Sequence, residues 1–356
     1  MVANIQQILC NKGFKIHILT KKQRIEAFAQ LGEYLLSDNP RLQQIIESAQ
    51  YSNPWFTAPN IQEAVKATAL NLSEDLLQDW LASYLFDGET EKTVGLVLAG
   101  NIPLVGFHDI LCVLCAGFSV QIKPSSDDPV LTAHLLAKLQ DICPAFVPKI
   151  NITERLKDFD LVIATGNDNS ARYFTYYFGG KPHIIRKNRN SLAVLTGKEN
   201  ADELHQLGND VFNYFGLGCR SVSKLFVPEG YDISAFFEGI ASFHDSINHH
   251  KYANNYDYNK SIYLINGNPH YDNGFLLVKP DERTASPLGV LYLEEYKNTA
   301  ALVELLNAQS AHLQCVVSNE HLAIATPVVD FGQSQRPTLD DYADGVNTLD
   351  FLTQHR

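Results

Sequence analysis

From Thr93 onward, short apolar runs alternate with longer segments of helical periodicity, and this alternation constrains the fold more than any other feature. The run Val94–Ala99 predicts a strand, Pro103–Cys115 predicts a helix, and Ser119–Ile122 predicts the next strand. These strands are apolar throughout, as is typical of parallel strands that helices cover on both faces. The alternation continues toward the C-terminus. The sequence therefore predicts an α/β fold in which two α/β lobes share a cleft.

The remaining elements follow the same alternation, after a first region without predicted strands. Residues 1–90 have amphipathic periodicity and are expected to be helical, with one helix over Lys21–Ser48. Further strands are expected at Leu161–Ala164, Leu192–Leu195, Lys224–Val227, Ser261–Ile265, Phe275–Val278, Val290–Leu293 and Cys315–Val317. Helices are expected between them at Pro129–Ile142, Ser170–Phe178, Ala201–Phe215, Ile233–Ile247 and Thr299–Ala308.

Charge and residue usage exclude several classes of protein. The net charge of −12 argues against nucleic-acid binding, which depends on clustered cations. Gly100, Pro103 and Asp109 interrupt the most apolar stretch, so we expect no integral membrane segment. Met1–Leu19 lacks the pattern of an export signal. The six cysteines are scattered along the chain without a dense framework, and His249-His250 has no partner ligands at suitable spacing, so we expect free thiols, a cytoplasmic location and no metal site.

Two residues are candidates for catalysis. Asn101 follows the strand Val94–Ala99, at the sheet edge where ligands of open α/β folds bind, and its amide could donate to an oxyanion. The alternative is that Asn101 only caps the helix expected from Pro103. Cys219 follows two glycines, which allow close approach of a ligand, and precedes Arg220, which would stabilise a thiolate. The alternative is a structural cysteine.

A second set of residues is a candidate for cofactor binding. The end of the second strand of a dinucleotide-binding unit meets the adenosine ribose, and here it offers Lys123, Ser125 and Ser126 instead of a carboxylate, which favours NADP(H). Thr165-Gly166 lies between a strand and a helix, where backbone N–H groups favour anions, and Gly100 occupies the equivalent turn after the first strand. The alternatives are a surface lysine and plain turns.

Substrate contacts are expected from a third set. His108 lies on the apolar helix that begins at the expected site, although a core histidine is the alternative. Arg186, Lys187 and Arg189 form a basic cluster in an acidic chain and could meet the phosphates of CoA or NADP. A solvated loop is the alternative for this cluster.

Taken in order, these segments resemble the aldehyde dehydrogenase superfamily, and within it the LuxC-type acyl-CoA reductase branch that makes fatty aldehyde for bacterial bioluminescence. The resemblance covers roughly Thr93 to Leu352. It is carried by Asn101-Ile102-Pro103, by Ala116-Gly117 through Ile122-Lys123-Pro124-Ser125, by Thr165-Gly166, by Phe215-Gly216-Leu217-Gly218-Cys219-Arg220 and by Phe331-Gly332-Gln333 with Asp341-Tyr342-Ala343-Asp344-Gly345-Val346.

The resemblance implies NADPH-dependent reduction of an acyl-CoA thioester to an aldehyde through a thioester on Cys219, with Asn101 holding the oxyanion. NADP(H) is the implied cofactor, with NAD(H) as a second option; acyl-CoA and CoA are the implied partners, and a homodimer stays open. Residues 91–197, joined by about 326–356, are expected to form the NADP-binding Rossmann-like domain. Residues 198–325 are expected to form the catalytic domain, and 1–90 a helical segment that packs on the cofactor domain.

Two departures from the superfamily pattern bear on the chemistry. The segment between Gly179 and Thr196 lacks the glutamate that activates the deacylating water in hydrolytic members, which suits exchange of acyl groups with CoA. The stretch Ser286-Pro287-Leu288-Gly289 replaces the usual glutamate that holds the nicotinamide ribose. An acyl-phosphate or semialdehyde reductase, and a catalytically degenerate binding or scaffold protein with the same fold, therefore stay as alternatives.

Overall fold

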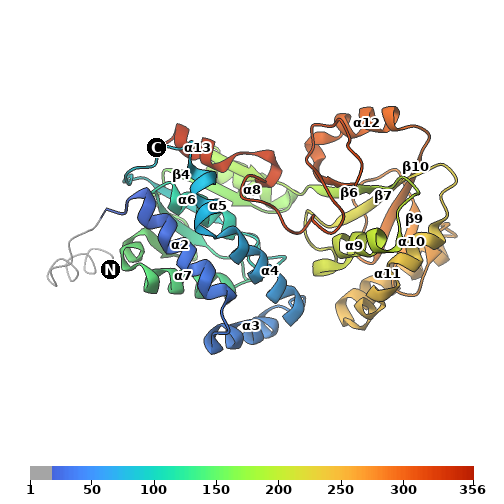
Figure 1. Ribbon diagram of the computed structural model, residues 1–356, viewed down its shortest axis with the longest axis horizontal. Coiled ribbons are helices and arrows are strands. Elements are labelled where there is room, and N and C mark those ends of the chain that lie inside the picture. Colours follow the sequence, from blue (N-terminus) through green and yellow to red (C-terminus); the bar gives the residue numbers. More distant parts are fainter. Residues whose placement is uncertain (1–17) are drawn as a thin grey trace.

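The computed structural model describes residues 18–356, in which two lobes lie side by side, each built around its own sheet (Figure 1). The first sheet has the strand order β3-β2-β1-β4-β5, and all of its pairs are parallel. Its strands are β1 (Thr93–Val97), β2 (Ser119–Lys123), β3 (Ile150–Ile152), β4 (Leu161–Thr165) and β5 (His183–Arg186). Its helices are α6 (Phe107–Cys115), α7 (Leu131–Ile142) and α8 (Asp168–Phe178), with the short η1 (Pro144–Lys149).

The second sheet has the order β12-β11-β6-β7-β10-β9-β8, and β8 pairs antiparallel with β9 at one edge. Its strands are β6 (Asn190–Val194), β7 (Val222–Pro228), β8 (Tyr271–Asp272), β9 (Leu277–Pro280), β10 (Val290–Tyr296), β11 (Leu313–Val317) and β12 (Val328–Val329). Its helices are α9 (Ala201–Phe212), α10 (Ile233–Gly239), α11 (His250–Ile265) and α12 (Thr299–Ala308), with the short η2 (Asn213–Gly216), η3 (Ala241–Asn248) and η4 (Ser310–His312). The predicted α/β class with parallel sheets is thus confirmed.

The N-terminal segment is helical, as expected, and packs on the first lobe (Figure 1). It consists of α2 (Lys21–Leu36), α3 (Pro40–Ser52), α4 (Ala58–Asn71) and α5 (Glu74–Leu81). Phe28 of α2 is fully buried, with its ring edge-on to Phe107 and Phe146 at centroid distances of 6.4 and 5.9 Å. These aromatic contacts join the segment to α6 and η1, so the first lobe and the segment share one hydrophobic core.

The C-terminal segment returns from the second lobe to the first (Figure 1). After β12, the carbonyl of Pro337 accepts a hydrogen bond from Asn71 of α4 at 2.9 Å, and the Tyr342 hydroxyl accepts one from the indole of Trp80 at 2.9 Å. The short η5 (Ala343–Gly345) and α13 (Thr348–Gln354) follow. We call residues 330–347, between β12 and α13, the C-terminal crossing. It borders both lobes and the space between them.

Several predicted elements are wrong in type or extent. The expected strand Ser261–Ile265 is the end of helix α11, whose buried residues recur at helical spacing. The expected helix Lys21–Ser48 is two helices, because Asn39 caps a new helix and Pro40 begins it. The helix expected from Pro103 begins at Phe107. The helix expected to reach Phe215 ends at Phe212.

One strand lies in a different sheet from the one we expected. The range 91–197 included the strand at Leu192–Leu195 in the first lobe, but β6 pairs with β7 and β11 in the second sheet. The change from one sheet to the other therefore falls between Arg186 and Asn190. Residues 1–17, including Cys10 and most of the segment tested for an export signal, lie outside the described residues.

Two general findings apply to residues 18–356. No helix in this range combines the length and the apolar composition needed to cross a bilayer. The same range also contains no group of three or more His, Cys, Asp or Glu side chains that could hold a metal ion. The cysteines in the range, namely Cys112, Cys115, Cys143, Cys219 and Cys315, are free thiols.

Candidate active site

A cavity of about 730 Å³ lies between the two sheets and contains most of the residues singled out in the sequence. Its walls come from the carboxyl ends of β1, β4 and β5, from the loop before β7, from helix α4 and from the C-terminal crossing. Asn101 and Cys219 both line it. The sheet edges therefore bring together the two predicted catalytic residues, which are separated by more than a hundred positions in the chain.

Asn101 connects the first sheet to the loop that carries Cys219. Its side-chain N–H donates to the carbonyl of Leu217 at 2.8 Å, two residues before the cysteine. Asn101 does not cap a helix, because α6 begins only at Phe107 after Gly106. The capping alternative is therefore wrong, and the second N–H of the amide is left for another acceptor.

The turn that presents Asn101 depends on a buried carboxylate that the sequence did not single out for this role. Leu104 has a left-handed φ of 58°, and its N–H donates to Asp128 at 3.0 Å. Asp128 also accepts hydrogen bonds from Leu131 N–H at 3.3 Å and the Thr132 hydroxyl at 3.3 Å. Burial raises the pKa of Asp128, and these donors oppose that shift. A buried polar group that is satisfied in this way fixes the local backbone.

Cys219 lies at the end of a loop with unusual backbone geometry. Tyr214, Phe215 and Gly216 have successive left-handed φ values of 55°, 56° and 79°. The left-handed conformation costs about 1–2 kcal/mol for each residue other than glycine. The Ser191 hydroxyl of β6 donates to the carbonyl of Cys219 at 3.0 Å. No backbone carbonyl of the described residues accepts from the Cys219 N–H, so this group can donate to a ligand in the cavity.

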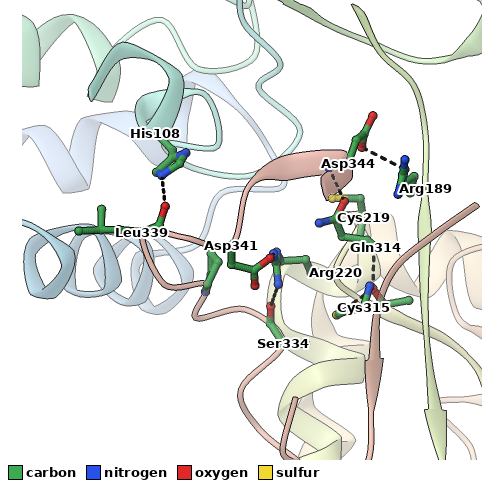
Figure 2. Close-up of polar contacts among 12 residues, drawn as sticks. His108, Arg189, Cys219, Arg220, Gln314, Cys315, Ser334, Leu339, Asp341 and Asp344 are labelled. Atoms are coloured by element: carbon green, nitrogen blue, oxygen red, sulfur yellow. Dashed lines mark hydrogen bonds and ion pairs between the residues drawn. The ribbon is translucent and has the colours of Figure 1, made fainter. Parts of the chain in front are cut away.

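The thiol of Cys219 is exposed to the cavity but surrounded by protein atoms and charges. Desolvation by those atoms raises its pKa, the Arg220 guanidinium opposes that shift, and the Asp344 carboxylate adds to it. Arg220 itself is buried and paired with Asp341, and it donates to the carbonyl of Ser334 at 3.5 Å (Figure 2). Desolvation outweighs the charge of Arg220, so the pKa of the Cys219 thiol stays above its ordinary value.

Asp344 is a site residue that the sequence indicated only as part of the motif Asp341-Tyr342-Ala343-Asp344-Gly345-Val346. It lines the cavity, its φ is 59°, and its N–H donates to Gln314 at 3.0 Å (Figure 2). Its carboxylate lies 3.5 Å from the Arg189 guanidinium. Burial raises the pKa of Asp344, and Arg189 opposes that shift. The Asp344-Gly345 pair, both left-handed, is the sequence signal that could have marked this turn.

The predicted cofactor residues are only partly brought together. Gly100, Ser125, Thr165 and Gly166 line the cavity, whereas Lys123 and Ser126 are exposed and lie outside its lining. A Cβ at Gly100 would lie 2.5 Å from the Ser125 hydroxyl oxygen, so only glycine allows the ends of β1 and β2 to approach this closely. At the start of α8, Asn167 caps the helix by accepting from Ser170 N–H at 2.9 Å. The remaining N–H groups of this first turn still favour an anion.

The three candidates for substrate contact have different surroundings. His108 lines the cavity, its ring bonds the carbonyl of Leu339 at 3.0 Å, and burial lowers its pKa, which favours the neutral ring. Arg189 donates to the Leu313 carbonyl at 3.1 Å in addition to its contact with Asp344. Arg189 of the expected basic cluster is thus held by contacts within the protein.

Arg186 also lines the cavity, but it is the buried member of this set. It is 4% exposed, it forms an ion pair with Asp109 of α6, and it donates to the Thr348 hydroxyl at 3.0 Å. Arg186 therefore joins α6 to α13, and the alternative of a solvated loop is wrong for it. Its contact with a phosphate group stays a prediction. Lys187 is the exposed cation of the cluster on the cavity wall.

Comparisons with known proteins bear on the family and on the fold. The sequence model of the family described as Acyl-CoA reductase (LuxC) matches residues 21–249. A comparison with curated proteins finds no match.

Solved structures share the fold at low sequence identity. Aldehyde dehydrogenase 21 from Physcomitrella patens, in complex with the reaction product succinate, is 13% identical with a TM-score of 0.69 over 94% of this chain and 84% of that chain. An NAD-dependent benzaldehyde dehydrogenase from Corynebacterium glutamicum is 14% identical with a TM-score of 0.66 over 88% and 81%. An indole-3-acetaldehyde dehydrogenase mutant from P. syringae, in complex with NAD+ and IAA, is 12% identical with a TM-score of 0.63 over 88% and 76%. The predicted aldehyde-dehydrogenase-like fold is confirmed.

The charge of Asp344 gives a prediction for thiol reactivity. Asp344→Asn removes a negative charge that raises the Cys219 pKa, and asparagine tolerates the left-handed backbone. We therefore expect a lower thiol pKa and faster alkylation of Cys219 by iodoacetamide at pH 7, measured by mass spectrometry across a pH series. Asp340→Asn, at an exposed position on the same segment, is the control. Identical pH profiles in the two variants would show that Asp344 does not act on the thiol.

Proposed function

The chain belongs to the LuxC family of acyl-CoA reductases, oxidoreductases that act on acyl and aldehyde groups, and we propose that it reduces an acyl-CoA thioester to an aldehyde through a thioester on Cys219. NADPH is the hydride donor in this proposal. The observation that carries it is the bond from Asn101 to the Leu217 carbonyl, because it places an amide donor beside the loop of a cavity-facing thiol. This is the donor set that acyl transfer to a cysteine requires.

Acylation is the first step of the proposed reaction. The Cys219 thiolate attacks the thioester carbonyl, and the carbonyl oxygen becomes an oxyanion. The free N–H of the Asn101 amide and the backbone N–H of Cys219 donate to that oxyanion. The oxyanion then collapses, the bond from carbon to the CoA sulfur breaks, and the CoA thiolate leaves with a proton taken from solvent. The acyl group stays on Cys219 as a thioester.

Reduction is the second step. A bound reduced nicotinamide would supply the hydride that converts the Cys219 thioester to a thiohemiacetal oxyanion. The same two donors hold this oxyanion. On its collapse the bond from carbon to the Cys219 sulfur breaks, aldehyde is released, and the cysteine regains its starting state. The electron balance is one hydride for each thioester reduced to an aldehyde.

The carboxylates near Cys219 support transfer over hydrolysis. Asp341 is paired with Arg220, Asp109 with Arg186, and Asp344 with Arg189. No glutamate lines the cavity among the described residues. A guanidinium that pairs with a carboxylate occupies its oxygens, so each of these side chains is less free to orient a water molecule. A thioester on Cys219 therefore has little assistance toward hydrolysis and persists until hydride arrives.

The cofactor and the acyl group occupy different ends of the cavity in this proposal. The solved neighbour that contains NAD+ supports a nicotinamide cofactor, and we infer that it lies at the sheet edge formed by Ser125, Thr165 and Gly166, which line the cavity. The backbone N–H groups at the start of α8 suit a pyrophosphate there, and glycine at position 166 lets the turn pack closely against Ser170 and Phe174 of that helix. Lys123, exposed at the end of β2, suits the 2′-phosphate of NADPH, and NADH is the second option.

The acyl group would lie against the N-terminal segment. Small residues of α4, namely Ala64, Ala67 and Thr68, line the cavity together with Leu104, Val105, Phe107 and the neutral ring of His108. This part of the wall is largely apolar, as the chain of a fatty acyl group requires. In this proposal, α4 of the N-terminal segment forms one wall of the acyl channel.

Steady-state assays test the proposed function. Purified protein should oxidise NADPH when supplied with acyl-CoA, with a rate that depends on acyl chain length, and Cys219→Ala should abolish the activity. Cys143→Ala, which changes a half-buried cysteine outside the cavity lining, is the matched control. Activity in Cys219→Ala would contradict the mechanism. Reduction of acyl phosphates in place of CoA thioesters would assign the alternative reductase, and no NADPH binding would favour a scaffold.

Asn101→Ala tests the oxyanion donor. Removal of one such donor costs about 10²–10³ in turnover, and we expect a loss of that size with the fold retained. The kcat for acyl-CoA reduction and the circular dichroism spectrum measure the two effects. Asn188→Ala, which changes an exposed asparagine on the same cavity wall, should leave kcat unchanged. Equal kcat values in the two variants would remove Asn101 from the mechanism.

Lys123→Glu tests the cofactor preference. A carboxylate at this position would repel a 2′-phosphate and accept a ribose hydroxyl, so we expect KM to rise for NADPH and to fall or stay constant for NADH. Lys198→Glu makes the same charge change at an exposed position of the second lobe and controls for net charge. A parallel rise of KM for both cofactors in Lys123→Glu would contradict a role in 2′-phosphate recognition.

A further inference from the structure

An aromatic cluster between the lobes contacts the loop that carries Cys219. We define the interlobe cluster as Trp55, Phe215 and His249. The ring of His249 is stacked on Trp55 at 5.2 Å between centroids and 18° between planes, and on Phe215 at 4.2 Å and 29°. Trp55 and Phe215 are tilted against each other at 5.8 Å. Each member therefore touches the other two.

The members of the interlobe cluster come from three separate elements. Trp55 lies in the loop between α3 and α4, where Asn53 accepts from its N–H at 3.0 Å and donates to the Asp127 carbonyl of the first lobe at 3.1 Å. His249 precedes α11 of the second lobe. Phe215 lies in η2, just before the loop that carries Cys219. The cluster thus joins the N-terminal segment, the second lobe and the segment that leads to Cys219.

Hydrogen bonds fix the ring of His249. One ring nitrogen, Nε2, lies 2.8 Å from the carbonyl of Pro54, and the other, Nδ1, accepts from Tyr252 N–H at 3.4 Å. The ring therefore donates at Nε2 and accepts at Nδ1, which is the neutral form. Its orientation is set by backbone groups of two different elements, so it can hold the Phe215 ring in place.

Phe215 occupies the middle of the left-handed run Tyr214–Gly216. A bulky residue in this conformation persists only where surrounding contacts hold it. Two residues later the Leu217 carbonyl accepts from Asn101, and four residues later the chain reaches Cys219. If Phe215 lost its ring partners, the run could relax and both Leu217 and Cys219 would move.

We propose that the interlobe cluster is a positioning device for the nucleophile. It holds the left-handed turn before Cys219 and makes the placement of the thiol depend on docking of the N-terminal segment. The inference rests on the proposed function of Cys219, which gives the positioning its purpose. Trp55, Phe215 and His249 act through the loop, so they are positioning residues without contact to the reacting atoms.

Trp55→Ala tests the positioning role, with Trp55→Phe as the conservative variant that keeps a stacked ring. Small misplacements of reacting groups cost up to about 10²-fold in rate. We expect Trp55→Ala to lower kcat by 10-fold or more while KM for NADPH stays within twofold of the wild-type value. Trp55→Phe should recover most of the lost kcat. A loss of NADPH binding in proportion to kcat, or no recovery with phenylalanine, would overturn the proposal.

A histidine pair supplies the matched control. His249→Gln removes the stacked ring, whereas His250→Gln changes the exposed neighbour on the same turn. We expect the rate of Cys219 alkylation by iodoacetamide, followed by peptide mass spectrometry, to change in His249→Gln and Trp55→Ala and to stay at the wild-type value in His250→Gln. Equal rates in all variants would overturn the proposal.

The alkylation measurement does not depend on acyl-CoA chemistry. It separates a failure of the positioning role from a failure of the proposed function. A wild-type protein that reduces no acyl-CoA would overturn the function. An unchanged alkylation rate in Trp55→Ala would overturn the positioning.

Discussion

The hydrogen bond from the Asn101 side chain to the Leu217 carbonyl is the contact on which the site depends. It joins the carboxyl edge of the first sheet to the loop that carries the only cavity-lining cysteine of the described residues. Neither partner could reach the other without the turn that Asp128 holds on one side and the left-handed run before Cys219 on the other. The chemistry therefore depends on two unfavourable backbone turns, each fixed by contacts made far away in the chain.

The second feature of the site is the pairing of its arginines with carboxylates. Three arginines near the cavity are each paired with a carboxylate of a different segment, so the cavity wall carries little free positive charge. The pairs join α6, the loop before β7 and the C-terminal crossing, which gives them a structural role. In the proposed function, recognition of phosphate groups is then left to cations outside these ion pairs. Lys123 and Lys187 are the exposed cations next to the sheet edge.

The α/β fold could be predicted from the sequence because buried parallel strands are short and apolar, and because Gly100-Asn101 and Gly218-Cys219 mark sheet edges. It did not reveal contacts between distant positions. Arg186 pairs with Asp109, 77 positions away in the chain, and the His249 ring bonds the Pro54 carbonyl, 195 positions away. The helix expected from Pro103 starts later because Leu104 bonds Asp128, 24 residues away. The strand expected at Ser261–Ile265 is wrong because the four apolar residues after Ser261 satisfy either period until the helix that precedes them is known.

Mass spectrometry of the intact protein tests the central claim most directly. The protein is incubated with a defined acyl-CoA in the absence of reduced nicotinamide and then digested. The account predicts a mass increase equal to one acyl group, located on the peptide that contains Cys219 and lost when NADPH is added, with release of the aldehyde. An acyl group on a different residue, or reduction of acyl-CoA by a protein that never acquires one, would contradict it.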